Sequence, residues 1–331
     1  MSTLRVAVII PVFNGANTIA RALDSVLHQT FDGLLEIMVV NDGSTDSTAE
    51  VLGRYGERLR VLDQHNQGPA AARNAGVARS SAEYLAFLDA DDAFTPDKLA
   101  RTVPHLANHQ NAVMLFHDAI VLNREGREAG RSYVWPERAH APSMDEMLAA
   151  WWPIVPSTVV MRRTAFVACG GFCEQFKVPG YEDPDLWIRA RERGAFIFLP
   201  DRLTYYMTSE LRSERMEKYV DSRDLFFRRL RQLYGHRADQ LIRSTVRNYV
   251  NWLGHQGRLA MQQGDQAAAR AYFARILRRH PTHLKSALRY LRTFLPPPLA
   301  RALSGRTAGK RASPPATVSQ GATAAETPGR R

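Results

Sequence analysis

Three carboxylates are gathered in the segment FLDADD, residues 87–92, which continues a run of apolar residues typical of a buried strand. Asp89, Asp91 and Asp92 lie within four positions of one another. Like charges at this spacing repel one another and are costly to remove from water, so a positive group is expected there. Oxygen ligands at a strand end suit Mg²⁺ or Mn²⁺ bound to a diphosphate. Taken alone, the segment fits a solvated acidic turn before a helix equally well.

Polar or aromatic residues follow three other predicted strands. IIPVFNGANT contains Phe13, VVNDGSTDST contains Asp42, and NQGPAAARNAG contains Arg73. In an open α/β sheet, ligands bind beyond the carboxyl ends of the strands. Phe13 could therefore present its ring to a base, Asp42 could accept from a base N–H, and Arg73 could bind a base carbonyl or a phosphate. The alternatives are a core ring, a turn former and a surface charge.

A fifth polar segment, YEDPDLWIRARERG, has three carboxylates near its start, Glu182, Asp183 and Asp185, followed by an apolar group. The sequence predicts a helix that begins at Asp185 and packs residues 186–188 inward. Glu182 and Asp183 would then lie in the loop before the helix, where they could face a cleft. The alternative is that the three carboxylates cap the helix and complement its dipole.

The elements that position these residues alternate between strand and helix. Apolar, Val- and Ile-rich runs predict strands over 5–10, 35–40, 59–63, 84–88 and 111–118. Helices are predicted with an N-cap at Asn17, from about Asp46, after Gly68-Pro69 and from about Pro96. This order predicts an α/β fold with a mainly parallel sheet covered by helices on both faces.

With these motifs in their order along the chain, the sequence resembles the family 2 glycosyltransferases, which have the GT-A fold. The resemblance covers roughly residues 4–205 and rests on six segments: PVFN (11–14), VNDGSTDST (40–48), NQGPAAARNAG (66–76), FLDADD (87–92), GGF (170–172) and YEDPDLWIR (181–189). It implies a catalytic domain over 1–212, with a nucleotide-sugar-binding half (1–120) and an acceptor-binding half (121–212). A basic helical region (213–298) and a disordered tail (299–331) would follow.

The resemblance also implies the roles of the site residues. Asp91 would hold a Mn²⁺ or Mg²⁺ ion, and Asp89 would contact the ribose or the metal. The enzymes of this family generally invert the sugar's configuration and need one carboxylate base; Asp183 is expected in that role, with Glu182 second. The nucleotide sugar would be bound by Val12, Phe13, Asp42, Asn66, Arg73 and Asp89.

Two features are less fully determined by the resemblance. Trp151 and Trp152 could line the acceptor site, since aromatic faces stack on sugars, although aromatics in this context are more often core. Many relatives carry a His shortly after the last strand of this domain, near the metal or diphosphate. Here the segment 203–214 is LTYYMTSELRSE and contains none. Thr208, Ser209 or water could replace it.

Charge divides the chain unevenly. Residues 1–200 carry 19 Lys/Arg against 24 Asp/Glu, whereas residues 201–331 carry 25 against 9. Such a basic half could meet nucleic acid, anionic lipid or an acidic acceptor. In the segment 284–295, the apolar residues share one helical face and the basic residues lie off it. This pattern suits a helix on an anionic membrane, and it equally suits packing against the catalytic domain.

The sequence therefore predicts a metal-assisted, inverting transfer of a sugar from a nucleotide donor, with UDP as the expected nucleotide, to a hydroxyl of a glycan or lipid-linked acceptor in surface polysaccharide synthesis. No apolar stretch reaches the ~18–20 residues of a membrane span, so we expect a cytoplasmic protein that contacts the inner face of the membrane peripherally. We expect no nucleic-acid binding, because only the charge of the C-terminal part favours it. The alternative is an inactive, transferase-like protein that acts as a basic membrane-surface or partner-binding module. A nucleotidyltransferase or a dinucleotide-binding oxidoreductase is not supported, since the first strand is followed by no Gly-rich basic loop or G-x-G-x-x-G.

Overall fold

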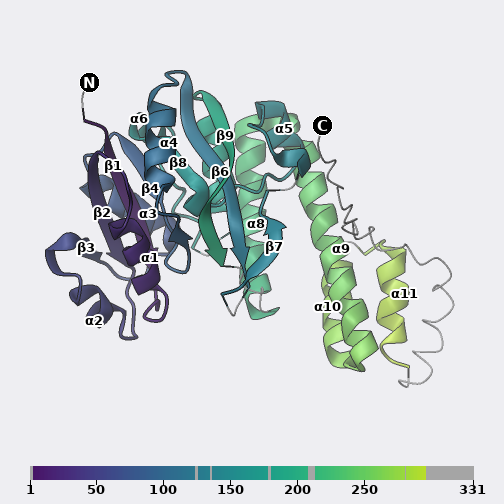
Figure 1. Cartoon of the computed structure of the whole chain (residues 1–331). Coiled ribbons are helices and arrows are strands. Elements are labelled where there is room, and N and C mark those ends of the chain that lie inside the picture. The colour runs from purple at the N-terminus through teal and green to yellow at the C-terminus, as the bar shows by residue number, and fades with distance from the viewer. Residues whose placement is uncertain are drawn as a thin grey trace, which may run out of the picture. The chain divides into compact units, whose positions relative to one another are not determined.

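The computed structural model describes residues 3–123, 126–134, 136–177, 180–207, 213–279 and 281–295 (Figure 1). Residues up to Thr245 belong to one compact unit, and residues from Val246 belong to a second. The first unit contains a nine-stranded sheet with the order β3-β2-β1-β4-β8-β6-β9-β5, and β7 pairs with β6 at one side of this path. The predicted tail lies outside the described residues. The predicted functional boundary near residue 212 stays a prediction.

The N-terminal half of the sheet is parallel, as predicted from the apolar runs. Its strands are β1 (Arg5–Val12), β2 (Leu34–Asn41), β3 (Arg60–Asp63) and β4 (Tyr84–Phe87), and β1 pairs in parallel with both β2 and β4. The helices between them are α1 (Ile19–Leu27), α2 (Thr48–Gly53) and α3 (Pro69–Arg79). The carboxyl ends of these strands therefore lie at one edge of the sheet, where ligands of open α/β sheets bind.

Alternating residues of β1 pack on opposite faces of the sheet, as the pleat requires. Val6, Val8 and Ile10 belong to a buried cluster with residues of α1 and of α4 (Lys98–Ala107). On the other face, α3 packs against β1 and β2. A Cβ at Gly76 of α3 would lie 2.7 Å from the Ile9 Cγ2 atom, so this helix approaches the sheet closely.

The second half of the sheet mixes parallel and antiparallel pairs. β6 (Ala112–Leu122) runs parallel to β9 (Ala195–Met207) and antiparallel to β8 (Val159–Arg162) and β7 (Glu128–Ser132), while β5 (Ala93–Phe94) pairs antiparallel with β9. The helices of this half are α5 (Met144–Ala149), α6 (Arg163–Ala168) and α7 (Glu182–Arg191). Ring centroids of Phe87, Phe166, Phe172 and Trp187 lie 5.3–6.5 Å apart and connect β4 to α6 and α7.

Two predicted helix starts are wrong. The N-cap of α1 is Thr18 and not Asn17, and its side chain makes no capping hydrogen bond. Helix α7 begins at Glu182 and not at Asp185, so Glu182 and Asp183 lie in its first turn instead of in a preceding loop. The two carboxylates still point toward other segments of the chain, because tertiary contacts with α3 hold them.

The remaining helices are α8 (Ser213–Tyr234), α9 (Asp239–Gln263), α10 (Gln266–Arg279) and α11 (Leu284–Arg292). The helical C-terminal region predicted from the sequence is thus present. The second unit has its own small core, formed by Leu253, Ala260, Ala269, Phe273 and Ile276. Among the described residues, no helix is long and apolar enough to span a bilayer.

Candidate active site

Arg73 brings together carboxylates that are far apart in the sequence. Its side chain is 4% exposed, and its Nη2 atom lies 2.6 Å from the Asp89 Oδ1 atom. Its Nη1 atom lies 3.2 Å from the Glu182 Oε1 atom and 3.5 Å from the Asp183 Oδ1 atom. The Arg73 guanidinium also lies over the ring of Phe172, 5.2 Å from its centroid. One buried cation therefore joins the end of β4 to the first turn of α7.

The local sequence places Arg73 where it can reach both elements. Pro69 occupies the first turn of α3, as its missing N–H favours, and Gly68 before it has φ of +89°. Burial by itself lowers the pKa of Arg73, but the attraction of Asp89, Asp183 and Glu182 outweighs this effect and raises the pKa above its ordinary value. The guanidinium therefore remains charged.

Glu182 and Asp183 are held differently by their surroundings. Glu182 is 1% exposed and accepts a hydrogen bond of 2.7 Å from the Gly180 N–H through its second oxygen. Asp183 is 16% exposed at its side chain, and its Oδ1 atom is buried without a hydrogen-bond partner. Burial and the neighbouring Glu182 raise the pKa of Asp183 well above its usual value, and Arg73 opposes this shift. A carboxylate with a raised pKa is a stronger proton acceptor.

The three aspartates after β4 differ in exposure. Asp89 is 31% exposed at its side chain, Asp91 is exposed, and Asp92 is buried at 1%. The Asp92 Oδ1 atom accepts from the Met207 N–H at 2.9 Å, whereas its Oδ2 atom is buried without a partner. Burial raises the pKa of Asp92 well above its usual value, and Asp91 and Asp89 add to the shift. Asp92 thus ties this turn to the end of β9, and Asp89 and Asp91 are left at the surface.

A buried lysine lies beneath the aspartate turn and was not predicted as a functional residue. Lys98 is fully buried; its Nζ atom donates to the Ser157 carbonyl at 2.7 Å and lies 3.4 Å from the Phe94 ring centroid. The Ser157 hydroxyl in turn accepts from the Asp89 N–H at 3.0 Å. Burial lowers the pKa of Lys98, and Asp92 opposes this shift. The sequence does indicate the burial of Lys98, because this lysine shares a face of its helix with Leu99 and Thr102.

The residues predicted to bind the nucleotide surround the ends of β1 and β2. Phe13 is 50% exposed beyond buried Val12, so its ring is available to a ligand. Asp42 is buried at 3%, and both its oxygens accept from the loop after β3: from the Gln64 side chain at 2.7 Å and from the N–H groups of residues 67 and 68 at 2.9 Å. Asn66 is exposed in that same loop. Asp42 therefore shapes the loop that carries Asn66.

The predicted acceptor residues have unequal access to solvent. Trp152 is buried at 6%, with Arg138 over its ring at 4.7 Å and His140 edge-on at 5.0 Å. Trp151 is half-buried and packs edge to face against Tyr181, which directly precedes Glu182. Of the two tryptophans, only Trp151 has a solvent-exposed side-chain surface near Glu182 and Asp183. Thr208 and Ser209, the predicted substitutes for the missing His, lie outside the described residues.

Carboxylate oxygens are the candidate metal ligands at this edge of the sheet. Within the described part of the chain, no three His, Cys, Asp or Glu side chains converge as a ready metal site. Asp91 provides an exposed carboxylate, and Asp89, two residues away, provides a half-buried one whose Oδ1 atom is paired with Arg73; carboxylate oxygens of this kind suit Mg²⁺ or Mn²⁺ when substrate phosphates supply further ligands. The donor set therefore fits an ion shared with a diphosphate better than an ion held by protein alone.

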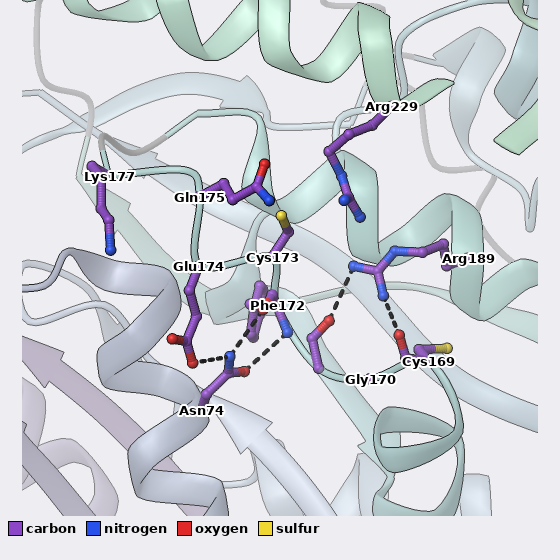
Figure 2. Close-up of a pocket in the computed structure, with 11 residues that line it drawn as sticks. Asn74, Cys169, Gly170, Phe172, Cys173, Glu174, Gln175, Lys177, Arg189 and Arg229 are labelled. Atoms are coloured by element: carbon purple, nitrogen blue, oxygen red, sulfur yellow. Dashed lines mark hydrogen bonds between the residues drawn. The ribbon is translucent and has the colours of Figure 1, made fainter. Parts of the chain in front are cut away.

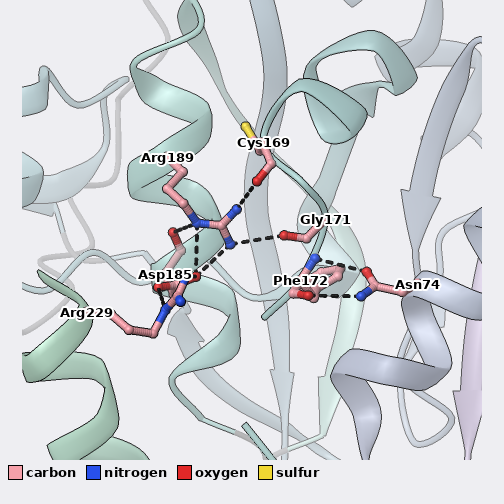
Figure 3. Close-up of polar contacts among 7 residues, drawn as sticks. All are labelled: Asn74, Cys169, Gly171, Phe172, Asp185, Arg189 and Arg229. Carbon is pink, nitrogen blue, oxygen red and sulfur yellow. Dashed lines mark hydrogen bonds and ion pairs between the residues drawn. The ribbon is translucent and has the colours of Figure 1, made fainter. Parts of the chain in front are cut away.

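A cavity of about 620 Å³ lies on the side of α3 that carries Asn74 (Figure 2). Phe172, whose ring contacts Arg73, is one of its lining residues. The cavity is lined by the loop CGGFC and by Lys177, Arg189 and Arg229, and none of the predicted site residues lines it. Its wall is held by Asp185, which is 3% exposed and accepts from both Arg189 and Arg229 (Figure 3). Asp185 therefore has a structural role. The two thiols in the loop, Cys169 and Cys173, are free and partly buried.

Comparisons with known proteins point to one family. Residues 7–169 match the family described as Glycosyl transferase family 2. An uncharacterized glycosyltransferase of Rickettsia prowazekii is 28% identical over 235 residues, which cover 68% of this chain and 72% of that protein. The chondroitin synthase of Pasteurella multocida is 31% identical over 194 residues, or 58% of this chain and 19% of that protein. The chain thus spans well under two thirds of the length of several curated relatives, including 14% of a Rickettsia bellii glycosyltransferase.

The fold has a counterpart among solved structures. The crystal structure of S. aureus TarS 1–349 in complex with UDP has a TM-score of 0.56 at 19% sequence identity, over 88% of this chain and 90% of that one. The complex of the same protein with UDP-GlcNAc has a TM-score of 0.58. At this identity the likeness concerns the fold, and it confirms the predicted GT-A architecture.

Proposed function

The chain belongs to glycosyl transferase family 2, and from this premise we propose that it moves a sugar from a nucleotide-diphosphate sugar to an acceptor hydroxyl, with inversion at the anomeric carbon. The observation that carries the proposal is the single guanidinium of Arg73 that joins Asp89, at the end of β4, to Glu182 and Asp183. A donor-side carboxylate and a candidate base are thereby fixed relative to each other, which lowers the entropic cost of bringing donor and acceptor together.

Asp183 is the proposed general base. The acceptor oxygen attacks the anomeric carbon as its proton moves to the Asp183 carboxylate, and the bond from that carbon to the diphosphate oxygen breaks with its electron pair. The raised pKa of Asp183 favours proton uptake, and the partial exposure of its side chain leaves it within reach of an acceptor. Glu182 is fully buried and is better suited to fixing Arg73 than to meeting a substrate.

Asp89 and Asp91 are the residues that we propose hold a divalent cation together with the donor diphosphate. Such an ion supplies Lewis-acid stabilisation of the charge that develops on the departing diphosphate. Two hydrogen bonds support the aspartate turn. The Asp92 carboxylate accepts from the Met207 N–H, and the Ser157 hydroxyl accepts from the Asp89 N–H. These contacts keep the Asp89 and Asp91 carboxylates at the carboxyl end of β4.

A UDP-sugar is the proposed donor, and a glycan or lipid-linked hydroxyl compound in surface polysaccharide synthesis is the proposed acceptor. The donor is supported by the UDP and UDP-GlcNAc complexes of S. aureus TarS, and the acceptor by the chondroitin synthase among the relatives. The exposed ring of Phe13 and the loop held by Asp42 lie where the base would bind. A cytoplasmic location follows from such a donor and is part of this proposal.

The test is a panel of nucleotide sugars offered to the purified chain with Mn²⁺ and, separately, with EDTA. A true donor at about 100 times its Kd stabilises the fold by about 2.7 kcal/mol, and we expect release of the nucleoside diphosphate that EDTA abolishes. Asp91→Asn should lose the response to Mn²⁺. Asp145→Asn, at a side chain 89% exposed, is the matched control and should behave as wild type.

The competing function is an inactive transferase-like module. The one observation that favours it is the absence of His from residues 203–214. A chain that binds a nucleotide sugar in this panel, and neither transfers nor hydrolyses it under any metal condition, would establish that reading instead.

A further inference from the structure

Helix α11 is held in the second unit by its polar side. Ser286 is 1% exposed and Thr293, just past the helix end, is fully buried. Arg270 of α10 donates to the Thr293 carbonyl at 3.1 Å, and the Gln266 side chain donates to the Leu295 carbonyl at 2.7 Å. Tyr290 packs against the small core of this unit. The Arg270 guanidinium also lies 4.1 Å from the centroid of the Phe294 ring. The helix is therefore fixed to α10, beside which it runs in Figure 1, through hydrogen bonds and contacts with two aromatic rings.

The opposite side of α11 is apolar and open to solvent. Leu284 is 70% exposed, Leu288 51% and Leu291 62%, and Phe294 beyond the helix end is 57% exposed. Their spacing of four, three and three residues places them along one side of the helix, which we call the apolar face. Exposed hydrophobic groups gathered in this way mark an interaction surface more often than scattered ones do. An amphipathic helix that turned this face inward would need no partner, so the observed orientation calls for one.

Basic residues flank the apolar face on one side. Lys285, Arg289 and Arg292 lie on the same helix, and residues 246–295 contain nine lysines and arginines against one carboxylate, Asp265. Partial burial lowers the pKa of Arg289, and repulsion by Arg258 and Arg292 adds to the shift. A helix with an apolar face flanked by cations matches the interface of an anionic bilayer, where apolar groups enter the acyl boundary and cations meet the headgroups.

We propose that the apolar face of α11 docks this chain on an anionic lipid surface. A second copy of the chain is a poorer occupant, because it would bring the same excess of cations against the first. Binding through α11 is peripheral, in agreement with the lack of a membrane-spanning helix in the described residues. The proposal does not depend on the transferase reaction: a chain without activity would dock in the same way.

Vesicle co-sedimentation of the full chain tests this surface. Vesicles of phosphatidylcholine with about 30 mol% phosphatidylglycerol should bind the chain, and vesicles of phosphatidylcholine alone should bind it at least about tenfold more weakly. The variant Leu288→Gln/Leu291→Gln should lose on the order of tenfold or more in affinity for the anionic vesicles. Leu233→Gln alters a leucine of α8 that is 49% exposed, and as the matched control it should bind like wild type.

Several results would overturn the proposal. Equal binding of the Leu288→Gln/Leu291→Gln variant and wild type would show that the basic tail or general charge is responsible. Equal binding to neutral and anionic vesicles, or no binding to either, would remove the lipid surface as the partner. A dimer in sedimentation equilibrium without lipid, dissociated by the same leucine variant, would assign the face to a second copy. Circular dichroism of each variant establishes that the helices remain folded.

Discussion

Replacing Arg73 by methionine removes the cation that joins the aspartate turn to α7. Methionine preserves most of the side-chain volume and the contact with Phe172, but it offers no charge to Asp89, Glu182 and Asp183. The three carboxylates would then lie together at a site where the Glu182 side chain is only 1% exposed. We expect this single change to weaken the whole first unit and not only its activity.

The magnitude follows from the burial of the cluster. Removing one partner from a buried ion pair costs about 3–5 kcal/mol, because an uncompensated charge remains in the interior. For a domain of this size, 1 kcal/mol shifts the melting temperature by roughly 2–4 °C, so a fall of about 6–20 °C is expected at neutral pH. The exposed pair Arg101–Asp201, at 2.6 Å, is the control: Arg101→Met should cost only about 0–1 kcal/mol.

The loss should depend on pH with a defined sign. The pKa values of Asp183 and Glu182 are already raised by burial in the wild-type chain, with Arg73 opposing the shift, so the Arg73→Met variant raises them further. A carboxyl group whose pKa is higher in the folded state takes up more protons there than in the unfolded state. The free energy of unfolding therefore falls as pH rises from the unfolded pKa to the folded pKa. The variant should be closest to wild type near pH 5 and furthest from it near pH 8.

Urea unfolding followed by circular dichroism at these two pH values measures both quantities. Adding Asp183→Asn to Arg73→Met should recover part of the lost stability at pH 8, since it removes one of the unpaired charges. The reasoning is refuted if Arg73→Met costs less than about 1 kcal/mol. It is equally refuted if the loss is the same at both pH values.

Three further predictions concern the pH profile, the buried lysine and the helix–sheet contact. In the wild-type chain, kcat should fall on the acid side as Asp183 becomes protonated, with a midpoint above the ordinary carboxyl range because burial raises its pKa; a flat profile down to about pH 4 would contradict this. Lys98→Met should cost about 1–3 kcal/mol in urea unfolding, because the acceptor of its 2.7 Å hydrogen bond loses a donor in the interior; a gain of stability would contradict it. Gly76→Ala should cost about 1–3 kcal/mol, since its Cβ would lie 2.7 Å from the Ile9 Cγ2 atom. Gly53→Ala, where no atom would lie within 4 Å of the added Cβ, should be neutral or stabilising by up to about 1 kcal/mol. Urea unfolding measures both glycine variants.

The parallel half of the sheet could be predicted from the sequence because buried parallel strands need continuous apolar runs. RVAVII and LEIMVV each lie within an observed strand, and YLAFL extends one residue beyond the strand that it predicts, which ends at Phe87. Helix boundaries were less predictable, as the starts of α1 and α7 show. Asp185 looked like a helix start because it precedes Leu186 and Trp187. It lies inside α7 instead, and its carboxylate accepts from Arg189 of the same helix and from Arg229 of α8.

The site could be predicted as a set of residues but not as a set of contacts. The carboxylates after β4 and near α7 were recognised from their types and order. Sequence spacing could not show that Arg73 binds three of them, since Asp89 lies 16 residues away and Glu182 lies 109 residues away. Lys98 was missed because a charged residue in a helix suggests exposure, and its burial depends on the distant Ser157 carbonyl. The outward orientation of the α11 leucines likewise depends on polar contacts from α10.

Turnover by Asp183→Asn, with a donor identified from the nucleotide-sugar panel, tests the central claim most directly. The variant keeps the shape of the side chain and removes the proton acceptor. We predict that its Kd for the nucleoside diphosphate stays within about threefold of wild type, while kcat for transfer falls by about 10²–10⁴-fold. A folded Asp183→Asn chain that transfers the sugar at the wild-type rate would contradict the assignment of Asp183 as the base.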